Sequence, residues 1–520
     1  MRKYRWNKLA VSMLAVVAIF TSIKSYASVK MVMVDGQERP AYREGEVIVK
    51  YKDGAVRTRN EVASLYQRIS VKDIKRFNGV LKNFEHLKFD NNSLTVDQAV
   101  LELSRDPSVE YAQPNYMIYA FKNEKAKPAA EPCMIPGLPF PPGCEDGGDG
   151  GGDNPAPGGP CLIPGIPFPP GCEDGGDGGG GNPSPTPPPS NRPAIEPAPA
   201  EVNPPVADPD LVKAYGIGKV AADKAWATQK GSKSVIVAVI DTGIDYNHPD
   251  LAFNMWRNSS SATFKRTGID PNGSDITGDV VGWDFVHNDN LPYDDNQHGT
   301  HCAGVIGAVG GDGKGISGVN QRVSLMAVKF LSGEGSGDTA GAISGIDYAI
   351  SRGAKVLSNS WGGKGDDGSN GALKDSVKRA AGAGVLFIAA AGNDGTDNDR
   401  DPTFPASFDV DNMVTVAATT ETDGIAFFSN KGAKSVHVGA PGTNVYSTVP
   451  GNRYAKLSGT SMACPHVAGA AALLWAQFPN ENYKQIKDRL MKFGDALPAL
   501  NGKTITGKRI NVEKSLSGTL

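Results

Sequence analysis

The chain has 520 residues, more than one ordinary hydrophobic core accommodates, so several structural units are expected, at least one of them large. The formal net charge is -3, which excludes the strongly basic surface that binds nucleic acid or anionic lipid. Six cysteines permit disulfide bonds if the chain is exported, because disulfides persist in oxidising compartments.

The first residues predict a secretory signal peptide. Residues 1–8 are basic, residues 9–20 are apolar, and the small-x-small sequence SYA ends at Ala27. We expect cleavage after Ala27, which removes residues 1–27. The apolar stretch is too short to cross a bilayer and none of spanning length follows, so the mature protein is expected to be secreted or periplasmic, without a membrane span.

The following segment predicts a small α+β domain between residues 44 and 120. GEVIVKY is typical of a strand, EVASLYQ and DQAVLELSR have helical spacing, and VEYAQPNYMIYA is a closing extended segment. With its flanks, this domain is assigned to residues 28–121.

Proline, glycine and acidic residues dominate the chain after Phe121. The sequence PCMIPGLPFPPGCEDGGDGGG, which begins at Pro132, recurs as PCLIPGIPFPPGCEDGGDGGG at Pro160. Proline cannot join regular hydrogen-bond ladders and glycine loses much entropy on ordering, so residues 122–207 are expected to form an extended, disordered tether. Two copies are too few for a self-supporting solenoid.

Each repeat carries one pair of cysteines, Cys133 with Cys144 and Cys161 with Cys172. Four cysteines allow three pairings, and the equal spacing favours two local disulfides, one in each repeat. Such bonds would close short loops within the tether.

Residues 208–520 have the pattern of an α/β domain. Apolar runs such as VIVAVI, KVLSNS and GVLFIAAAG alternate with helical stretches such as GAISGIDYAIS and LKDSVKRAA. Because the runs are apolar on both faces, they predict a mostly parallel sheet covered by helices, with the functional site at the carboxyl ends of its strands.

Three short motifs contain Asp241 (VIDTGID), His298 (DDNQHGTHCAG) and Ser461 (SGTSMACPHVAG). Asp241 follows the run VIVAVI, and Pro465 suits a first helical turn, which places Ser461 at a helix amino terminus. A serine hydroxyl is a poor nucleophile until an imidazole removes its proton, and the imidazole needs a carboxylate to fix its tautomer. Taken alone, each residue is equally well explained without catalysis: Asp241 as a strand cap, His298 as a helix-capping histidine and Ser461 as a serine N-cap. Taken together, the three residues predict nucleophilic catalysis.

A fourth candidate is Asn393, at the end of GVLFIAAAGN. Its amide can donate to the oxyanion that forms when a serine attacks a peptide carbonyl. The ordinary alternative is a loop-forming asparagine after a strand. Its position at a strand end favours the catalytic role, because it puts Asn393 on the same sheet edge as Asp241.

At these residues the chain resembles the subtilisin-like serine proteases, whose DTGID, HGTH and GTSMAxPH motifs it carries in the same order. The resemblance implies a catalytic triad of Asp241, His298 and Ser461, with Asn393 as the oxyanion donor. It also implies a secreted endopeptidase that hydrolyses proteins and peptides through an acyl-enzyme. We expect it to act as a monomer.

Two further segments, GEGSG and NSWGG, resemble the edge segments between which such enzymes clamp an extended peptide. Backbone pairing of this kind accepts any extended chain, which favours broad specificity. The resemblance places six residues along the cleft: Gly335, Ser336, Gly337, Ser360, Trp361 and Gly362.

Residues 44–120 also resemble the propeptide of the family, whose closing strand lies in the cleft as a product-like inhibitor. This implies a zymogen that processes itself and whose own propeptide is its first partner. The tether between propeptide and catalytic domain departs from the family pattern. It leaves open whether cleavage falls near Ala120, after the repeats, or at both places.

Several acidic residues are candidates for calcium, which prefers clustered carboxylate and carbonyl oxygens on loops. Asp250 in HPDL matches a calcium ligand of the family, and Asp312 in GGDGKG is a weaker candidate. The segment GIDPNGSDITGDV resembles an inserted calcium loop of relatives, but ordinary solvated turn residues explain it equally well. Its candidate ligands are Asp270, Asn272, Asp275 and Asp279.

Cys302 lies four residues after His298, and Cys464 lies three residues after Ser461. On helices, this spacing puts each thiol on the face of its catalytic neighbour. Two small buried side chains without a catalytic role are the simpler explanation. If a thiol does border the triad, mercurials should inhibit the enzyme.

Two other functions were weighed. In the first, the repeats bind a cell-surface or matrix partner and the folded domain is an inactive scaffold, but all four catalytic positions are intact. In the second, the protein is a cytoplasmic maturation protease, but the predicted signal peptide argues against it.

Overall fold

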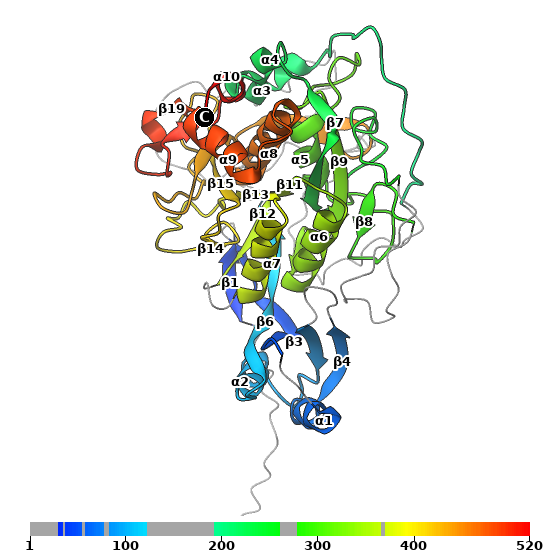
Figure 1. Cartoon of the computed structure of the whole chain (residues 1–520), viewed down its shortest axis with the longest axis vertical. Coiled ribbons are helices and arrows are strands. Elements are labelled where there is room, and N and C mark those ends of the chain that lie inside the picture. Colours follow the sequence, from blue (N-terminus) through cyan, green and yellow to red (C-terminus); the bar gives the residue numbers. More distant parts are fainter. Residues whose placement is uncertain are drawn as a thin grey trace, which may run out of the picture.

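The computed structural model divides into two lobes, an amino-terminal lobe of residues 30–121 and a larger lobe of residues 192–520 (Figure 1). The predicted signal peptide and the four repeat cysteines lie outside the described residues. The described residues are 30–34, 37–54, 58–76, 83–121, 192–259, 278–365 and 370–520.

The smaller lobe is an antiparallel sheet with two helices. Its elements are β1 (Met31–Val34), β2 (Gln37–Pro40), β3 (Tyr42–Tyr51), α1 (Arg59–Arg68), β4 (Val71–Arg76), β5 (Phe84–Phe89), α2 (Val96–Ser104) and β6 (Val109–Ala120). Thr58 and Thr95 begin α1 and α2 with capping boxes, in which the threonine side chain accepts from the third helical amide. β3 lies between β5 and β6 and buries Val47 and Val49 against α1 and α2, as the alternating sequence predicts.

In the larger lobe, two short α-helices precede the first strand of the main sheet. Its elements up to the middle of the lobe are α3 (Tyr215–Lys219), α4 (Ala222–Ala225), β7 (Gly231–Asp241), β8 (Gly282–Asp284), α5 (His298–Gly307), β9 (Arg322–Lys329), β10 (Ser336–Asp338), α6 (Thr339–Ser351), β11 (Val356–Asn359) and β12 (Trp361–Lys364). The rest are α7 (Gly371–Gly382), β13 (Leu386–Ala390), β14 (Thr403–Phe404), β15 (Met413–Thr419), β16 (Val438–Pro441), β17 (Val445–Val449), β18 (Arg453–Leu457), α8 (Thr460–Gln477), α9 (Tyr483–Lys492), β19 (Asp495–Ala496), β20 (Lys508–Arg509) and α10 (Val512–Ser517).

The central sheet of the larger lobe is mostly parallel. Within the described residues its order is β19-β20-β16-β15-β13-β11-β7-β9-β8, and only β19 runs antiparallel to its neighbour. Strand β7 is apolar on both faces: Val237 and Val239 pack with α5 and α8, and Ala238 and Ile240 pack with α6 and α7. The predicted fold, a mostly parallel sheet between helices preceded by a small α+β domain, is confirmed.

A second sheet joins the two lobes. Strand β6 pairs with β3 in the smaller lobe and continues between β10 and β12 of the larger lobe, antiparallel to both (Figure 1). The smaller lobe is therefore attached through the extended segment VEYAQPNYMIYA, which forms β6 over its whole predicted length.

The expected end of the tether needs correction. Residues 192–206 are not a free extension but lie along the larger lobe, where the side chain of Arg192 is buried and Val206 pairs with Asp312. The sequence-based boundary at residue 207 was wrong because prolines, which rule out regular ladders, still allow single backbone groups to bond to a neighbouring surface.

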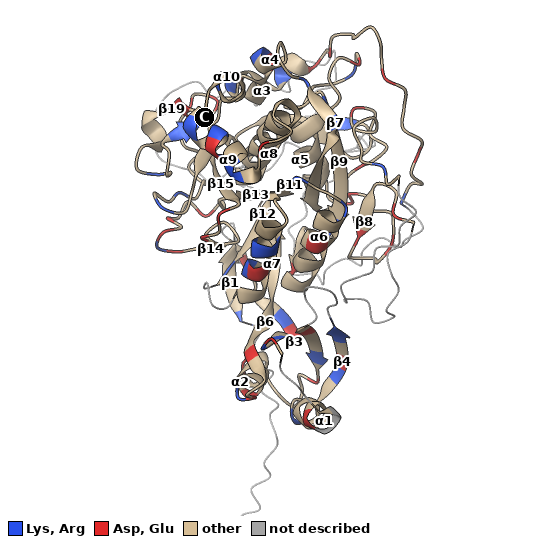
Figure 2. Ribbon diagram, in the orientation of Figure 1, with Lys and Arg blue, Asp and Glu red and all other residues tan. Residues whose placement is uncertain are grey.

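Acidic and basic side chains are interspersed over both lobes, in keeping with the net charge of -3 (Figure 2). In the part of the chain that the structure describes, none of the helices has the length and apolarity needed to cross a bilayer.

Candidate active site

The carboxyl edge of the parallel sheet gathers the predicted catalytic residues. Asp241 is the last residue of β7, and Asn393 follows β13 by three positions. His298 is the first residue of α5, and Ser461 is the second residue of α8, the helix that packs against α5. Four segments distant in sequence therefore meet at one edge, as expected for a parallel sheet.

Asp241 and His298 form a buried pair. His298 Nδ1 lies 2.7 Å from Asp241 Oδ1, and both side chains are fully buried. The Thr242 amide donates to the same carboxylate oxygen at 2.7 Å, which fixes its orientation. Within the described residues His298 Nε2 has no hydrogen-bond partner, so this ring atom is available to accept a proton.

Ser461 is held by the Ser360 peptide. Its hydroxyl donates to the Ser360 carbonyl at 2.9 Å, and its own carbonyl accepts from Ser360 Oγ at 3.0 Å and from Cys302 Sγ at 3.4 Å. That carbonyl lacks the usual partner because Pro465, four residues later, has no N–H. The first-turn placement of Pro465 was wrong: α8 begins at Thr460, so the proline lies in the second turn.

The amide of Asn393 has a fixed orientation. Its oxygen accepts from the Thr460 amide and from Thr460 Oγ1, each at 2.9 Å. Among the described residues its nitrogen, Asn393 Nδ2, is buried without a partner. A Cβ built on Gly459 would lie 3.3 Å from this nitrogen and 2.9 Å from the Phe121 carbonyl oxygen, so both border the same point of the cleft.

The six predicted cleft residues lie on either side of β6. Ser336 and Gly337 pair with Tyr119 and Ile118, and the Gly335 carbonyl accepts from the Ala120 amide at 2.9 Å. On the other side, Trp361 and Gly362 pair with Ala120 and Tyr119, and the Ser360 carbonyl accepts from the Phe121 amide at 3.3 Å. Only the backbone of Trp361 faces β6, because its indole is fully buried and donates to the Ile240 carbonyl at 2.7 Å.

Phe121, the residue after β6, is the deepest point of this inserted segment. Its side chain is 2% exposed, and a Cβ on Gly362 would lie 2.4 Å from the end of its ring. The absence of a side chain at Gly362 therefore makes the space that the Phe121 ring occupies.

The sequence matches known families in two places. Residues 232–502, more than half of the chain, match the model of the subtilase family, and residues 30–115 match that of the fervidolysin N-terminal prodomain. The chain belongs to the subtilase family. It is a subtilisin-like serine endopeptidase with an amino-terminal prodomain.

Three relatives indicate how far the likeness extends. Thermitase from Thermoactinomyces vulgaris is 42% identical over 263 residues, 51% of this subtilase and 82% of thermitase. Subtilisin DY from Bacillus licheniformis is 38% identical over 277 residues, 53% of this chain and 89% of that protein. A thermophilic serine proteinase from Bacillus sp. strain AK1 is 40% identical over 266 residues, 51% of this chain and 58% of that protein.

A second cluster of the subtilase surrounds Asp250. This side chain is fully buried, its Oδ2 accepts from the Ile316 amide at 2.9 Å, and no described residue bonds to its Oδ1. Burial raises the pKa of Asp250 to about 8, and the nearby carboxylates of Asp312 and Asp208 act in the same direction. Of these three carboxylates only Asp250 offers calcium an unpartnered oxygen, because Asp208 accepts from the amides of Gly311, Asp312 and Gly313, and Asp312 accepts from Lys314. Sequence analysis missed Asp208, which meets Asp312 only in the folded chain.

The other calcium candidates fare differently. Asp270, Asn272 and Asp275 lie outside the described residues. Asp279 does not fit a calcium site, because donors already occupy both of its oxygens: Arg352 Nη2 lies at 2.8 Å from Oδ1 and Tyr348 hydroxyl at 2.7 Å from Oδ2. Its carboxylate belongs to a buried ion pair instead.

The two described cysteines are buried and free. Cys302 borders Asp241 and His298: its sulfur and the nearest ligand atoms of both residues lie within 4.8 Å of one another. Cys464 faces β11, where its thiol donates to the Asn359 carbonyl at 3.8 Å. Burial raises the pKa of Cys464 to about 11 and that of Cys302 well above its usual value, so both are thiols at neutral pH.

Asp294, which sequence analysis also missed, holds the turn before His298. Its Oδ1 accepts from Thr242 Oγ1 at 2.8 Å and from the amide of Gln297 at 3.0 Å, and its Oδ2 accepts from Thr300. Gln297 has a φ of 107°, which residues with side chains rarely adopt. A carboxylate four residues before the histidine in DDNQHGTH was the available signal.

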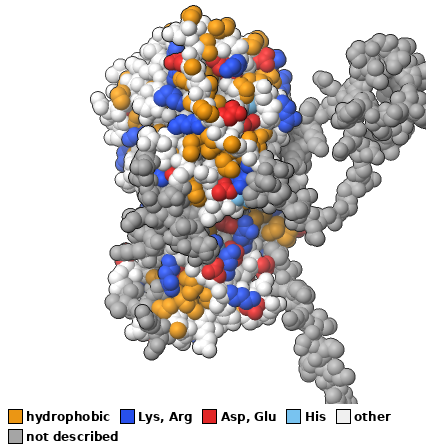
Figure 3. All heavy atoms as spheres, turned by 90° about the vertical axis from the view of Figure 1, so that its right-hand side faces the viewer, with side chains coloured by type: hydrophobic (Ala, Val, Ile, Leu, Met, Phe, Trp, Pro, Cys, Tyr) orange, Lys and Arg blue, Asp and Glu red, His pale blue; other side chains and the backbone are white. Residues whose placement is uncertain are grey.

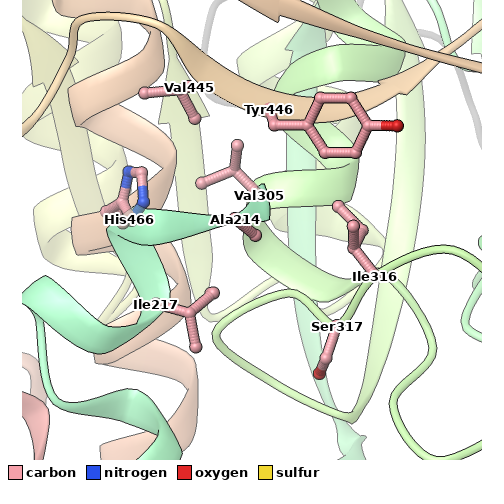
Figure 4. Close-up of a pocket in the computed structure, with 9 residues that line it drawn as sticks. Ala214, Ile217, Val305, Ile316, Ser317, Val445, Tyr446 and His466 are labelled. Carbon is pink, nitrogen blue, oxygen red and sulfur yellow. The ribbon is translucent and has the colours of Figure 1, made fainter. Parts of the chain in front are cut away.

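Two cavities lie away from the triad. The smaller, about 10 Å³, is lined by Ile217, Val305, Ile316 and His466 (Figure 4) and has room for one water at most. The larger, about 280 Å³, lies between the lobes and includes Arg43 and Asp338, which form an ion pair. Charged side chains gather where the lobes meet (Figure 3). Neither cavity is adjacent to Ser461.

Proposed function

We propose that this subtilase is a secreted zymogen whose catalytic triad is Asp241, His298 and Ser461. The observation that carries the proposal is the end of β6: the Phe121 amide donates to the Ser360 carbonyl, which also accepts from Ser461 Oγ, so Phe121 lies next to the proposed nucleophile, as the acyl part of a substrate would. Backbone pairing of β6 with β10 and β12 supports recognition of extended peptides by main-chain hydrogen bonds.

The chemistry begins at the serine hydroxyl. Asp241 holds His298 in the tautomer that carries its proton on Nδ1, which leaves Nε2 as the base. Ser461 Oγ gives its proton to His298 Nε2 and forms a bond to the substrate carbonyl carbon. The C–N bond then breaks, His298 returns the proton to the leaving amine, and an acyl-enzyme remains. Water repeats the two proton transfers and releases the acid.

Asn393 stabilises the negative charge on the carbonyl oxygen between these steps. Because Thr460 binds the amide oxygen, Asn393 Nδ2 is the atom that faces the cleft. A donor fixed before the reaction loses no energy by reorienting during it. The six cleft residues, from Gly335 to Gly362, position the substrate backbone on either side.

The prodomain acts as an inhibitor that the enzyme cuts after Phe121. Asn115 Oδ1 accepts from the Ala340 amide at 3.1 Å, and Gln113 Oε1 accepts from the Ala372 amide at 3.0 Å. These bonds satisfy amides in the first turns of α6 and α7, so the prodomain supports the helices that cover the sheet. We assign residues 28–121 to the inhibitor and residues 1–27 to a secretory signal. The enzyme is proposed to act as a monomer, without nucleic acid.

The buried space around Phe121 supports a preference for a large apolar residue before the cleaved bond. We also propose a structural calcium ion at Asp250, Asp312 and Asp208. When bound, it neutralises buried carboxylates and takes no part in the reaction.

Casein hydrolysis by the wild type and by Ser461→Ala tests this function, with and without a serine-directed sulfonyl reagent. The wild type should hydrolyse casein and lose activity to the reagent, whereas Ser461→Ala should be inactive and keep its prodomain. Equal activity of the two proteins would rule out Ser461 as the nucleophile.

A further inference from the structure

We propose that residues 192–206, here called the strap, remain a permanent part of the mature protease, fastened by Arg192. Every cut made during maturation then falls upstream of Arg192. This inference rests on the proposed self-processing, whereas the contacts between the strap and the larger lobe do not depend on it. Sequence analysis had left open whether a second cut follows the repeats.

Arg192 is the main attachment of the strap. Its side chain is 6% exposed, and Nη1 donates to Asp284 Oδ2 at 2.8 Å and to Asp289 Oδ1 at 3.0 Å. The same nitrogen donates to the Leu291 carbonyl at 2.9 Å, and Nη2 also bonds to Asp289. Breaking a buried ion pair leaves an uncompensated charge, so removal of this arginine is unfavourable.

The next residues bond to the turn after β7. Tyr246 hydroxyl donates to the Pro193 carbonyl at 2.5 Å, and Asn247 Nδ2 donates to the Ala194 carbonyl at 2.7 Å. The Glu196 amide returns a bond to Asn247 Oδ1 at 3.0 Å, and Ile195 packs against the main core. The strap thus buries apolar surface as well as polar groups.

The far end of the strap meets the loop of Asp312. The Val206 amide donates to the Gly311 carbonyl at 2.9 Å, and its carbonyl accepts from the Gly313 amide at 3.1 Å. Between the two ends, Glu201 forms an ion pair with Arg322 at 2.7 Å but stays 55% exposed. Both ends are held by backbone hydrogen bonds, although most of the strap, including Val206 at 51%, is exposed to solvent.

The composition of the strap also opposes its cleavage by the enzyme itself. The cleft holds β6 through backbone amides, such as those of Ala120 and Phe121. The strap contains five prolines, and proline has no amide to donate. It would also have to leave its attachments before it could enter the cleft as an extended strand.

The first test is the intact mass and amino-terminal sequence of the enzyme that the full chain produces. The expected mature chain begins at Lys122 and carries both repeats. A start between residues 123 and 192 keeps the strap and supports the inference, but contradicts cleavage after Phe121. A start beyond Arg192 overturns the inference, and absence of both processing and activity contradicts the proposed function alone.

The second test does not depend on processing, because it uses the Ser461→Ala precursor. Arg192→Met should lower the midpoint of thermal unfolding by several degrees and make the strap sensitive to thermolysin, whereas the matched control Glu201→Gln, at the exposed pair, should behave as the parent. Equal midpoints for the two variants would overturn the inference. If Arg192→Met does not fold, Arg192→Lys takes its place: it keeps the charge but loses the two-pronged geometry, so its midpoint of thermal unfolding should lie below that of the parent.

Discussion

Asn393 must present its nitrogen, and not its oxygen, to the cleft. Thr460 decides this orientation, because its amide and its hydroxyl are both donors and both bind the amide oxygen. The Gly392 amide donates in turn to Thr460 Oγ1 at 3.1 Å, so the hydroxyl has a fixed direction. Thr460, the residue before the proposed nucleophile, therefore fixes the orientation of the proposed oxyanion donor.

Replacing Asn393 by alanine should lower kcat about 100-fold to 1000-fold, the loss that subtilisin itself shows for its oxyanion asparagine. KM should stay near that of the wild type, but the thermal midpoint should fall, because the buried amide and hydroxyl of Thr460 lose the oxygen that accepts from them. Steady-state kinetics on a peptide substrate measure both constants. An unchanged kcat would remove Asn393 from the mechanism.

Cys302 and Cys464 differ in what they touch. Cys302 donates to the carbonyl of Ser461, whereas Cys464 contacts β11 below the site. Mercurials should therefore inhibit the wild type and Cys464→Ala, slowly because both thiols are buried, and leave Cys302→Ala active. Full activity of the wild type after complete modification of its thiols, or inhibition of Cys302→Ala, would contradict this assignment.

At the scale of elements, the prodomain works through the ends of two helices. Gln113 and Asn115 alternate along β6 and reach the first turns of α7 and α6, and Lys50 adds an ion pair to Asp375 of α7 at 2.9 Å. Helix amino termini expose amides without partners, so side chains that accept from them stabilise the complex. Strand β6 therefore carries both the segment proposed to inhibit the enzyme and the side chains that support α6 and α7.

Gln113→Ala in the full-length precursor should weaken binding of the cut prodomain. A lost cap costs about 0.5–2 kcal/mol, so the inhibition constant should rise about 2-fold to 30-fold and activity should appear sooner after processing. Time courses of peptide hydrolysis measure this delay. Leu101→Ala, on the exposed face of α2, serves as the control, and an unchanged delay in Gln113→Ala would contradict the capping role.

At the scale of the whole molecule, the strap joins the loop before His298 to the loop of Asp312. Asp208 lies two residues after the strap. Asp208 accepts from the Gly311 amide at 2.8 Å. Binding of a cation at the cluster around Asp250 would therefore stabilise the fold over a wide area.

Removal of calcium should lower the thermal midpoint of the mature enzyme. A ligand present at 100 times its Kd stabilises the folded state by about 2.7 kcal/mol, and chelation removes this contribution. Asp250→Asn should lose the dependence on calcium. The control Asp279→Asn, which breaks the ion pair with Arg352, should lower the thermal midpoint equally with and without calcium. If Asp250→Asn and Asp279→Asn respond to calcium removal in the same way, a calcium site at Asp250 is contradicted.

The sequence by itself determined the family, the parallel sheet and the candidate catalytic residues. These depend on local patterns: apolar runs set the strands, and short motifs such as GTSMACPH place a residue at the end of an element. The extended segment before Phe121 was also predictable, because alternation and length are properties of contiguous residues.

Only the tertiary structure decided the partners of those residues. The strap, the helix caps from Gln113 and Asn115, the meeting of Asp208 with Asp250 and the bond from Cys302 to Ser461 each join distant segments. A sequence shows which groups can donate or accept, but the topology of the sheet and the packing of its helices determine which of them meet.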